Sequence, residues 1–239
     1  MPWRRHRRTA PTLDARAQAT AWQISSLLLE YPDQQLWDRL ELLALEASEL
    51  PEHVARPLTR FIGRLADGAL QQWQTEYVDT FDVTRRCALH LTYFLHGDTR
   101  NRGAAMVQIK QAFRRSGAVL SDEDAELPDH LAVLLEFGAC VDAAAAWKIL
   151  NDHRVGVELL RRALSERNSP WLDVVQAVRA TLPRLDDDDE VALAKLIAEG
   201  PPTEEVGIDS TPYTLDPAVA AAHHPGPVSL GQTIEVGVR

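Results

Sequence analysis

Apolar side chains recur at helical spacing along most of this 239-residue chain, from about residue 15 to residue 200. In the stretch that begins at Leu36, apolar residues follow one another at intervals of three, four and seven positions, which is typical of one buried helix face. No segment shows the strict alternation of a half-buried strand, and no fixed-period repeat is present. The sequence therefore predicts an all-α fold, a single globular domain of about ten helices, more than a four-helix bundle contains.

The predicted helices are separated by turn residues and by breaks in the apolar pattern. They cover approximately residues 15–31, 36–47, 54–65, 69–79, 87–95, 103–115, 128–141, 143–167, 171–182 and 186–200. Pro57 is expected to kink or start its helix. Ser169 is expected to cap the helix that follows, with Pro170 in its first turn. The carboxylates of Asp186–Asp189 are expected to be solvated at the positive end of the last helix.

Composition limits the other classes of protein. Hydrophobic residues make up 45% of the chain, enough for a sizeable core, and two cysteines are too few for a disulfide scaffold or a four-cysteine zinc site. A net charge of −10 argues against general nucleic-acid binding, and no glycine-rich nucleotide motif occurs. We expect a basic flexible arm at residues 1–14, a helical domain at 15–200 and a proline-rich flexible tail at 201–239. Because no apolar stretch follows the N-terminal arginines, we expect a cytoplasmic protein without direct membrane insertion.

Charge is segregated in the middle of the chain. Residues 85–115 hold seven cations against one acid, whereas residues 116–152 hold eight acids against one lysine. Two interpretations stay open. The two segments neutralise each other or form solvated faces, or they form the cationic and anionic rims of a groove that orients a charged peptide.

The segment 77–103 interleaves aromatic, histidine, acidic and arginine residues more densely than core packing needs. Cys87, His90 and His96 are close enough in sequence to suggest a metal site, and Cys87 with His90 or His130 suggests a nucleophile pair. The metal site lacks convergent ligands, since His96 lies beyond the face that the first two share. The nucleophile pair lacks an identifiable oxyanion donor and orienting group. Histidines that hydrogen-bond within helix packing are the simpler interpretation.

Three consecutive blocks in this region resemble a known family. They read YVDTFD at 77–82, RRCALHLTY at 85–93 and HGDTRNRG at 96–103, and LPDHL at 127–131 with LLEF at 134–137 follows downstream. The first blocks resemble the NarJ-type chaperones, the delta subunits of respiratory nitrate reductase. The later ones are similar to the motif of the wider TorD/DmsD redox-enzyme maturation family. The resemblance covers roughly residues 15–200.

The resemblance implies an all-α protein with no catalytic site and no cofactor of its own. Such a chaperone binds the apo catalytic (alpha) subunit of nitrate reductase in the cytoplasm, through that subunit's N-terminal segment and a second surface. It keeps the subunit competent for molybdenum cofactor insertion before membrane docking. The expected partners are therefore this subunit and the machinery that delivers the molybdenum cofactor, with no nucleic acid among them.

A nascent segment can bind as an amphipathic helix in an apolar groove with a few directing polar groups. The residues expected to bind the client are Tyr77, Phe81, Asp82, Arg85, Arg86, His90, Leu91, Tyr93, His96, Asp98, Arg100, Arg102, Asp129, His130 and Glu136. For large aromatic residues such as Tyr77, Phe81 and Phe94, we favour a place in the core over the groove wall. Asp98, Arg100 and Arg102 fit surface binding and turn structure equally, and His130 fits a local hydrogen bond as well as a peptide contact.

Other functions compatible with the sequence are a chaperone for another molybdoenzyme with a twin-arginine leader and a generic helical scaffold. An alternative from a different class is a helical metal-dependent enzyme that uses Cys87, His90, His96 or His130.

Overall fold

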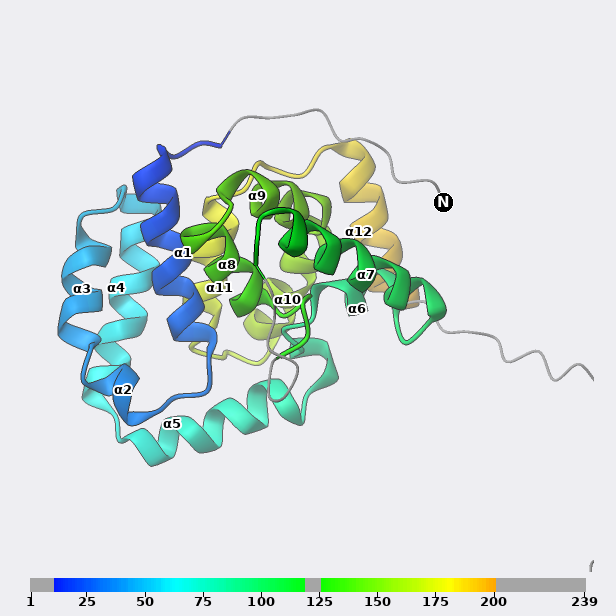
Figure 1. The fold of residues 1–239 in the computed structure, drawn as a ribbon. Helices are drawn as coiled ribbons and strands as arrows, with labels where there is room; N and C mark the ends of the chain where they lie inside the picture. The colour runs from blue at the N-terminus through cyan, green and yellow to red at the C-terminus, as the bar shows by residue number, and fades with distance from the viewer. Residues whose placement is uncertain (1–10, 119–125, 201–239) are drawn as a thin grey trace, which may run out of the picture. The chain divides into compact units, whose positions relative to one another are not determined.

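The structure, a computed structural model, describes residues 11–118 and 126–200. Within these ranges the chain forms twelve α-helices, one π-helical turn and one 3-10 turn, and no strand (Figure 1). The predicted all-α fold is confirmed, with two helices more than expected. The α-helices are α1 (Ala15–Leu29), α2 (Gln34–Trp37), α3 (Leu40–Ser48), α4 (Glu52–Asp67), α5 (Leu70–Tyr77), α6 (Leu91–His96), α7 (Arg100–Arg115), α8 (Leu131–Cys140), α9 (Ala143–Asp152), α10 (Arg154–Glu166), α11 (Leu172–Ala180) and α12 (Asp187–Glu199).

The core lies where α1, α4, α8, α10 and α11 meet. Helix α1 packs against α8 and α11, and α11 packs in turn against α4 and α10. Trp22 of α1 and Trp171, just before α11, are completely buried. Each indole N–H is satisfied: that of Trp22 donates to Thr181 Oγ1 and that of Trp171 to the carbonyl of Leu28, both at 3.0 Å. These bonds join the first helix to the last part of the core.

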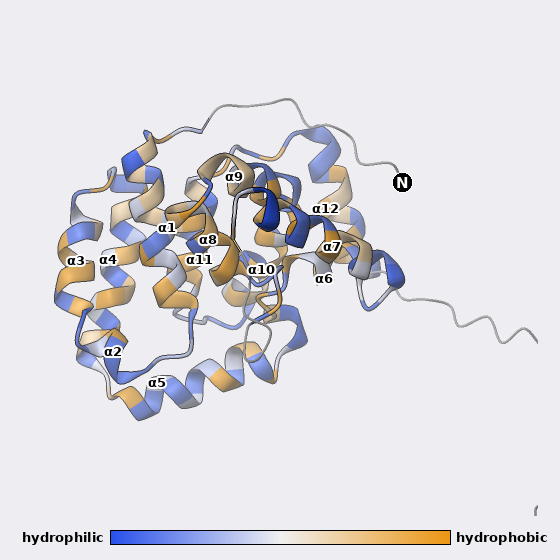
Figure 2. Cartoon of the chain, viewed as in Figure 1, coloured by the Kyte–Doolittle hydropathy of each residue, from blue (hydrophilic) through white to orange (hydrophobic). Residues whose placement is uncertain are grey.

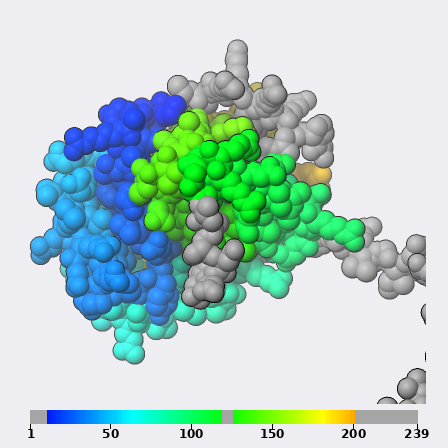
Figure 3. Space-filling model, in the orientation of Figure 1, coloured from blue at the N-terminus to red at the C-terminus, as the bar shows by residue number. Residues whose placement is uncertain are grey.

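Hydropathy separates the helices that build this core from those that cover it. Helix α8 is hydrophobic over most of its surface, whereas α7 is mostly hydrophilic (Figure 2). The space-filling view shows the surfaces of α1, of α8 and α9, and of α7 side by side on one face of the molecule (Figure 3). Helix α7 is therefore an outer layer, and it contacts α6.

The first helix begins at Ala15, and the two residues before it are ordered against it. Leu13 is buried in the core, and the Asp14 carboxylate accepts a 2.8 Å hydrogen bond from the backbone N–H of Ala17. Asp14 is thus the N-cap of α1. Residues 1–10 of the predicted arm and the predicted tail at 201–239 lie outside the described residues.

One long helix predicted at 143–167 is two helices, α9 and α10, and this part of the prediction is wrong. The break falls at His153, whose backbone leaves the helical conformation (φ −108°, ψ 14°). The buried His153 ring places Nδ1 2.8 Å from the carbonyl of Ile149, at the end of α9. The His153 carbonyl accepts from the N–H of Gly156 at 2.8 Å and so begins α10. His153 thus contacts the end of α9 with its side chain and begins α10 with its backbone carbonyl.

Three helix starts differ in detail from the sequence prediction. Helix α4 begins at Glu52, slightly earlier than expected; Pro57 lies inside it, so of its two expected roles, a kink or a start, only the start does not apply. The buried Ser169 hydroxyl makes no hydrogen bond within the described part of the chain, and α11 begins at Leu172. Asp186 caps α12 in a reciprocal capping box with Asp189, as the acidic run suggested, but Asp189 is buried rather than solvated.

Between α5 and α7 the chain turns repeatedly. Helix α5 continues into a π-helical turn at Val78–Asp82, then a 3-10 turn at Arg85–Cys87, then the short α6. Gly97 ends α6 in the left-handed region (φ 57°), where glycine carries no Cβ penalty. The predicted helices at 69–79 and 87–95 are therefore shorter than expected, and the densest motif block lies on turns.

Candidate functional site

The two motif blocks meet in a short antiparallel bridge between His90 and His130. The N–H of Leu91 donates to the carbonyl of Asp129 at 3.0 Å, and the N–H of Leu131 donates to the carbonyl of Leu89 at 2.8 Å. Helices α6 and α8 both begin directly after this bridge. The bridge therefore fixes the starts of both helices against each other.

The Asp129 side chain is completely buried beside the bridge. It accepts a short hydrogen bond from the Thr92 hydroxyl, and its oxygens lie 3.4 Å from His90 Nδ1 and 3.7 Å from an Arg102 guanidinium nitrogen. Burial alone would raise the pKa of Asp129, but His90, the Thr92 hydroxyl and Arg102 together lower it to about 2. The Asp129 carboxylate is thus ionised, and it interacts with other side chains of the protein rather than with solvent. We call Thr92, Arg102, Asp129, His90 and His130 the bridge cluster.

Arg102, in the first turns of α7, fitted surface binding and turn structure equally from the sequence, and in the structure its side chain is largely buried. Its guanidinium lies 3.2 Å from Asp98, stands over the Tyr93 ring at 5.8 Å from the centroid, and reaches Asp129. It therefore ties α7 to α6 and to the bridge. Asp98 itself is largely exposed at the turn before α7.

The two histidines of the bridge stack edge to face, with ring centroids 5.4 Å apart. His130 is buried, whereas about a quarter of the His90 side chain is exposed. Burial lowers the pKa of His130 to about 4, and the neighbouring His90 acts in the same direction. His130 is therefore neutral at physiological pH.

An acidic pocket of about 460 Å³ opens on one side of the bridge cluster. Its floor is aromatic: Tyr77 and Phe81 are buried, and the Tyr77 hydroxyl donates to the carbonyl of Leu29 at 3.0 Å. Four carboxylates surround it, and they are Glu30, Asp82, Glu126 and Glu136. Burial and then the charge of Glu136 raise the pKa of Glu30. The site is suited to a cationic group held over aromatic rings.

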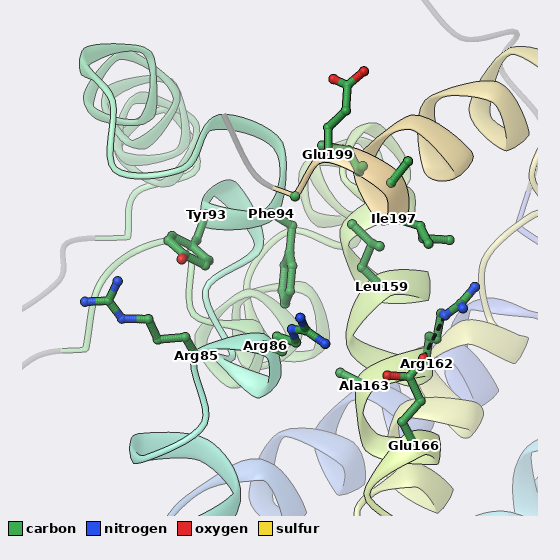
Figure 4. Close-up of a pocket in the computed structure, with 13 residues that line it drawn as sticks. Arg85, Arg86, Tyr93, Phe94, Leu159, Arg162, Ala163, Glu166, Ile197 and Glu199 are labelled. Carbon is green, nitrogen blue, oxygen red and sulfur yellow. Dashed lines mark hydrogen bonds and ion pairs between the residues drawn. The ribbon is translucent and has the colours of Figure 1, made fainter. Parts of the chain in front are cut away.

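A second hollow, which we call the α6–α10 groove, has a volume of about 600 Å³. Tyr93 and Phe94 of α6 and Leu159 and Ala163 of α10 line it, and Phe94 lies on the side of Tyr93 nearer to Leu159 (Figure 4). Arg85 and Arg86 of the 3-10 turn, Arg162 and Glu166 of α10, and the end of α12 from Leu196 to Gly200 complete the lining. Arg162 donates to Glu166 at 2.9 Å. This groove is amphipathic, with an apolar floor and charged edges.

In the structure the predicted client-binding residues lie in the acidic pocket, in the α6–α10 groove, in the bridge cluster and elsewhere. Tyr77, Phe81, Asp82, His90, His130 and Glu136 line the acidic pocket, and Arg85, Arg86 and Tyr93 line the α6–α10 groove. Asp129 and Arg102 belong to the bridge cluster, Leu91 is in the core, and His96 is in the last turn of α6. Arg100 is exposed at the start of α7. The opposite charges thus line two hollows rather than the two rims of one.

Several lining residues were not identified from the sequence. Glu30 and Tyr31 follow α1, far in sequence from the motif blocks, and Leu159 and Ala163 were predicted only to lie within the helix 143–167. Their spacing carries no signal of a site, because they line it only through the way the helices pack. Thr92 lies inside a motif block, and its polar side chain in an apolar run was the available signal.

The residues considered for metal or nucleophile chemistry do not converge. Across residues 11–118 and 126–200, no group of three or more histidine, cysteine, aspartate or glutamate side chains is placed to hold a metal ion. Cys87 is completely buried, and burial raises the pKa of its thiol, which disfavours the reactive thiolate. No helix among the described residues is long and apolar enough to span a membrane.

The fold matches that of a crystal structure from Archaeoglobus fulgidus described as a "Putative Redox Enzyme Maturation Protein". The two superpose with a TM-score of 0.50 at 20% identity, over 74% of this chain and 98% of that one. Residues 47–177 match the family described as "Nitrate reductase delta subunit", so the chain belongs to that family. This range contains the bridge cluster, most of the acidic pocket and the α6 and α10 walls of the groove.

Named relatives agree with this assignment. The nitrate reductase molybdenum cofactor assembly chaperone NarJ of Escherichia coli K12 is 33% identical over 196 residues, which is 81% of this chain and 79% of that protein. The nitrate reductase-like protein NarX of Mycobacterium tuberculosis H37Rv is 38% identical over 165 residues, or 67% of this chain. The present chain spans only 24% of the length of NarX.

Proposed function

We propose that this protein is an assembly chaperone for respiratory nitrate reductase. It binds the apo catalytic alpha subunit in the cytoplasm, including that subunit's N-terminal segment, and keeps it competent for molybdenum cofactor insertion before membrane docking. The observation that carries the proposal is the family match over residues 47–177, which spans the bridge cluster between the two hollows. The name of the E. coli relative supports the same function.

The geometry suggests how a client segment is held. The acidic pocket offers four carboxylates above buried aromatic rings, which favours a lysine or arginine side chain of the client. The α6–α10 groove offers Phe94, Leu159 and Ala163 to an apolar helix face. The segment 82–90 contributes residues to both hollows, so one client can contact both.

In this proposal the protein binds and releases its client without turnover and without a cofactor of its own. Asp129 and Arg102 act as positioning residues, because their charges are used inside the bridge cluster and hold α6, α7 and α8 together. We assign client binding to the helical domain, residues 15–200. The second client surface and the contact with the cofactor delivery machinery remain parts of this proposal that rest on the family resemblance.

The test is co-purification with the nitrate reductase alpha subunit produced in cells that lack the molybdenum cofactor. We expect a complex with the intact apo subunit, and a weaker one after removal of the subunit's N-terminal segment. In cells from which the gene for this protein has been deleted, the alpha subunit should lack the molybdenum cofactor and should be inactive. Full nitrate respiration in the deletion strain would contradict the proposal.

A second candidate is a chaperone for another molybdoenzyme, whose twin-arginine leader would place guanidinium groups in the acidic pocket. A competition between the alpha-subunit N-terminal peptide and such a leader peptide for the purified protein separates the two. Preferential binding of the leader would favour this candidate.

A further inference from the structure

Helix α12 is anchored strongly at its N-terminal end. Arg154 of α10 is buried and donates a short hydrogen bond from Nε to Asp189. Its other nitrogens lie 2.7 Å from Asp186 and 3.1 Å from the Asn151 side-chain oxygen. Since Asp186 and Asp189 also form the capping box of α12, one buried arginine holds the first turn of the helix onto α10.

The remainder of α12 is held weakly. None of its apolar side chains is buried, and Val191 and Ile197 are 71% and 39% exposed. The C-terminal half adds a Lys195–Glu199 pair at 3.8 Å, in which both side chains are exposed and which therefore contributes little. A helix of 13 residues is marginal in water without tertiary packing. The anchoring of α12 is thus one-sided.

The weakly held half lies over the α6–α10 groove. Leu196 and Ile197 of α12 both line the groove. Ile197 lies on the side opposite Phe94 of α6, with Leu159 of α10 between them (Figure 4). Adjacent apolar residues of one helix therefore already face the apolar floor. The groove accepts a helical apolar face, and in this structure α12 provides one.

The wall of the groove opposite α12 carries two positive charges that form no ion pair with the described residues of α12. Arg85 and Arg86 are exposed, and within the part of the chain that the structure describes neither guanidinium makes an ion pair. When the end of α12 moves away, Glu199 leaves the groove with it. The groove then presents an apolar floor beside the exposed guanidinium groups of Arg85 and Arg86, which fits an amphipathic helix with an acidic residue on its edge.

We propose that α12 is an internal competitor for the client. The N-terminal segment of the catalytic subunit binds as an amphipathic helix in the α6–α10 groove, and the C-terminal half of α12 swings away from the groove about the Arg154 anchor. This inference rests on the proposed function and names the surface and the regulation of that site. Part of the client's binding free energy is used to displace α12, so the free chaperone binds more weakly than an open one.

The test compares the affinities of three proteins for a synthetic peptide of the alpha subunit's N-terminal segment, measured by isothermal titration calorimetry. They are the full-length chain, a Leu196→Ser, Ile197→Ser double variant, and a Val191→Ser control on α12 outside the groove lining. Circular dichroism establishes that each is folded. We expect the double variant to bind about tenfold more tightly, because it releases α12, and the control to match the unaltered chain.

The other outcomes are distinct. Weaker binding by the double variant would mean that α12 is a fixed wall of the client site, and equal binding would mean that α12 does not compete; either overturns this inference and leaves the proposed function standing. Absence of binding to all three proteins would overturn both. As a second readout, the peptide should accelerate amide hydrogen exchange in residues 192–199 and slow it in α6 and α10. Slower exchange in α12 would contradict displacement.

Discussion

Asp129 shows how a residue of a motif can hold helices in place without being exposed on the surface. Its carboxylate is completely buried, yet it orders three elements, because Thr92 lies on α6, Arg102 on α7 and the bridge leads into α8. Removing the charge of Asp129 leaves the partly buried Arg102 with only the exposed Asp98 as a carboxylate partner, and the loss of a buried partner destabilises a fold.

Asp129→Asn should therefore lower the free energy of unfolding by about 2–4 kcal/mol, as measured by urea denaturation followed by tryptophan fluorescence. The matched control is Asp98→Asn, which removes the exposed carboxylate from the same arginine and should leave the midpoint unchanged. Equal effects of the two substitutions would show that the buried pairing does not stabilise the fold.

His130 predicts a pH dependence of stability. Burial lowers its pKa to about 4, against an ordinary value near 6.5, so the unfolded chain binds the proton first as pH falls. Stability is complete above pH 6.5 and is lost as pH falls from there through 4, by at most about 3 kcal/mol from this residue. Burial lowers the pKa of His96 and His153 as well, so these residues add to the same trend.

His130→Gln should make this decline shallower without abolishing it, while His53→Gln, at an exposed position of α4, should not. The measurement is the free energy of unfolding from pH 4.5 to 7.5. A slope unchanged by His130→Gln would contradict the assignment of a buried, neutral histidine.

At the residue scale, the sequence identified candidate residues but not how they are placed in the fold. His90, Asp129 and His130 were all identified, but residues 128–141 were predicted as helix and the pairing of residue 90 with residue 130 was not. A single bridge between segments 40 positions apart leaves no local periodicity. For the same reason, the inward direction of Arg102 could not be predicted.

At the element scale, helix existence was predictable and helix boundaries were less so. Periodicity identified α1, α4, α7 and α8, because each presents an apolar stripe to the core. It failed at His153, where a buried side chain ends α9 although the apolar pattern continues into α10. The π-helical turn after α5 likewise has no pattern of its own, since it depends on how α5 packs.

The contact between α1 and α8 yields a prediction about packing. Gly138 lies in α8 directly against Trp22, and a Cβ at this position would come within 2.5 Å of the indole ring and 2.6 Å of the Ala146 Cβ. Trp22 cannot easily move, because its N–H is bound to Thr181. Gly138 is therefore required for the close approach of the two helices.

Gly138→Ala should destabilise the protein by about 1–3 kcal/mol in urea denaturation, as expected for overpacking. Gly103→Ala is the matched control within α7, where an added Cβ meets nothing within 4 Å. It should stabilise the protein by up to about 1 kcal/mol through helix propensity. Tolerance of alanine at position 138 would mean that α1 and α8 can separate without loss.

At the scale of the whole molecule, residues of the cationic segment 85–115 and of the acidic segment 116–152 line different hollows. The sequence predicted either mutual neutralisation or two rims of one groove. The structure shows neutralisation at one place, where Arg102 and Asp129 lie together inside the protein, but it does not form two rims of one groove, because Arg85 and Glu136 line different hollows. The bridge cluster lies between these two hollows. The order of cationic and acidic residues along a client segment would therefore decide which part of the segment binds in which hollow.

This arrangement predicts that client binding depends on charge in the acidic pocket. Glu136→Lys should weaken binding of the alpha-subunit N-terminal peptide about tenfold, because reversing one carboxylate of four changes the attraction for a cationic side chain by on the order of 1–2 kcal/mol. Glu41→Lys, an equal change in net charge at an exposed position of α3, should have little effect.

The salt dependence of the same affinities separates a local effect from a general one. Binding to the unaltered chain and to the Glu41→Lys variant should weaken with added salt, since screening reduces the attraction of the exposed carboxylates. Binding to the Glu136→Lys variant should be less sensitive to salt, because part of that attraction is already lost. If both variants weaken binding equally, the client responds to the net charge of the molecule, and the acidic pocket is not where its cationic side chain binds.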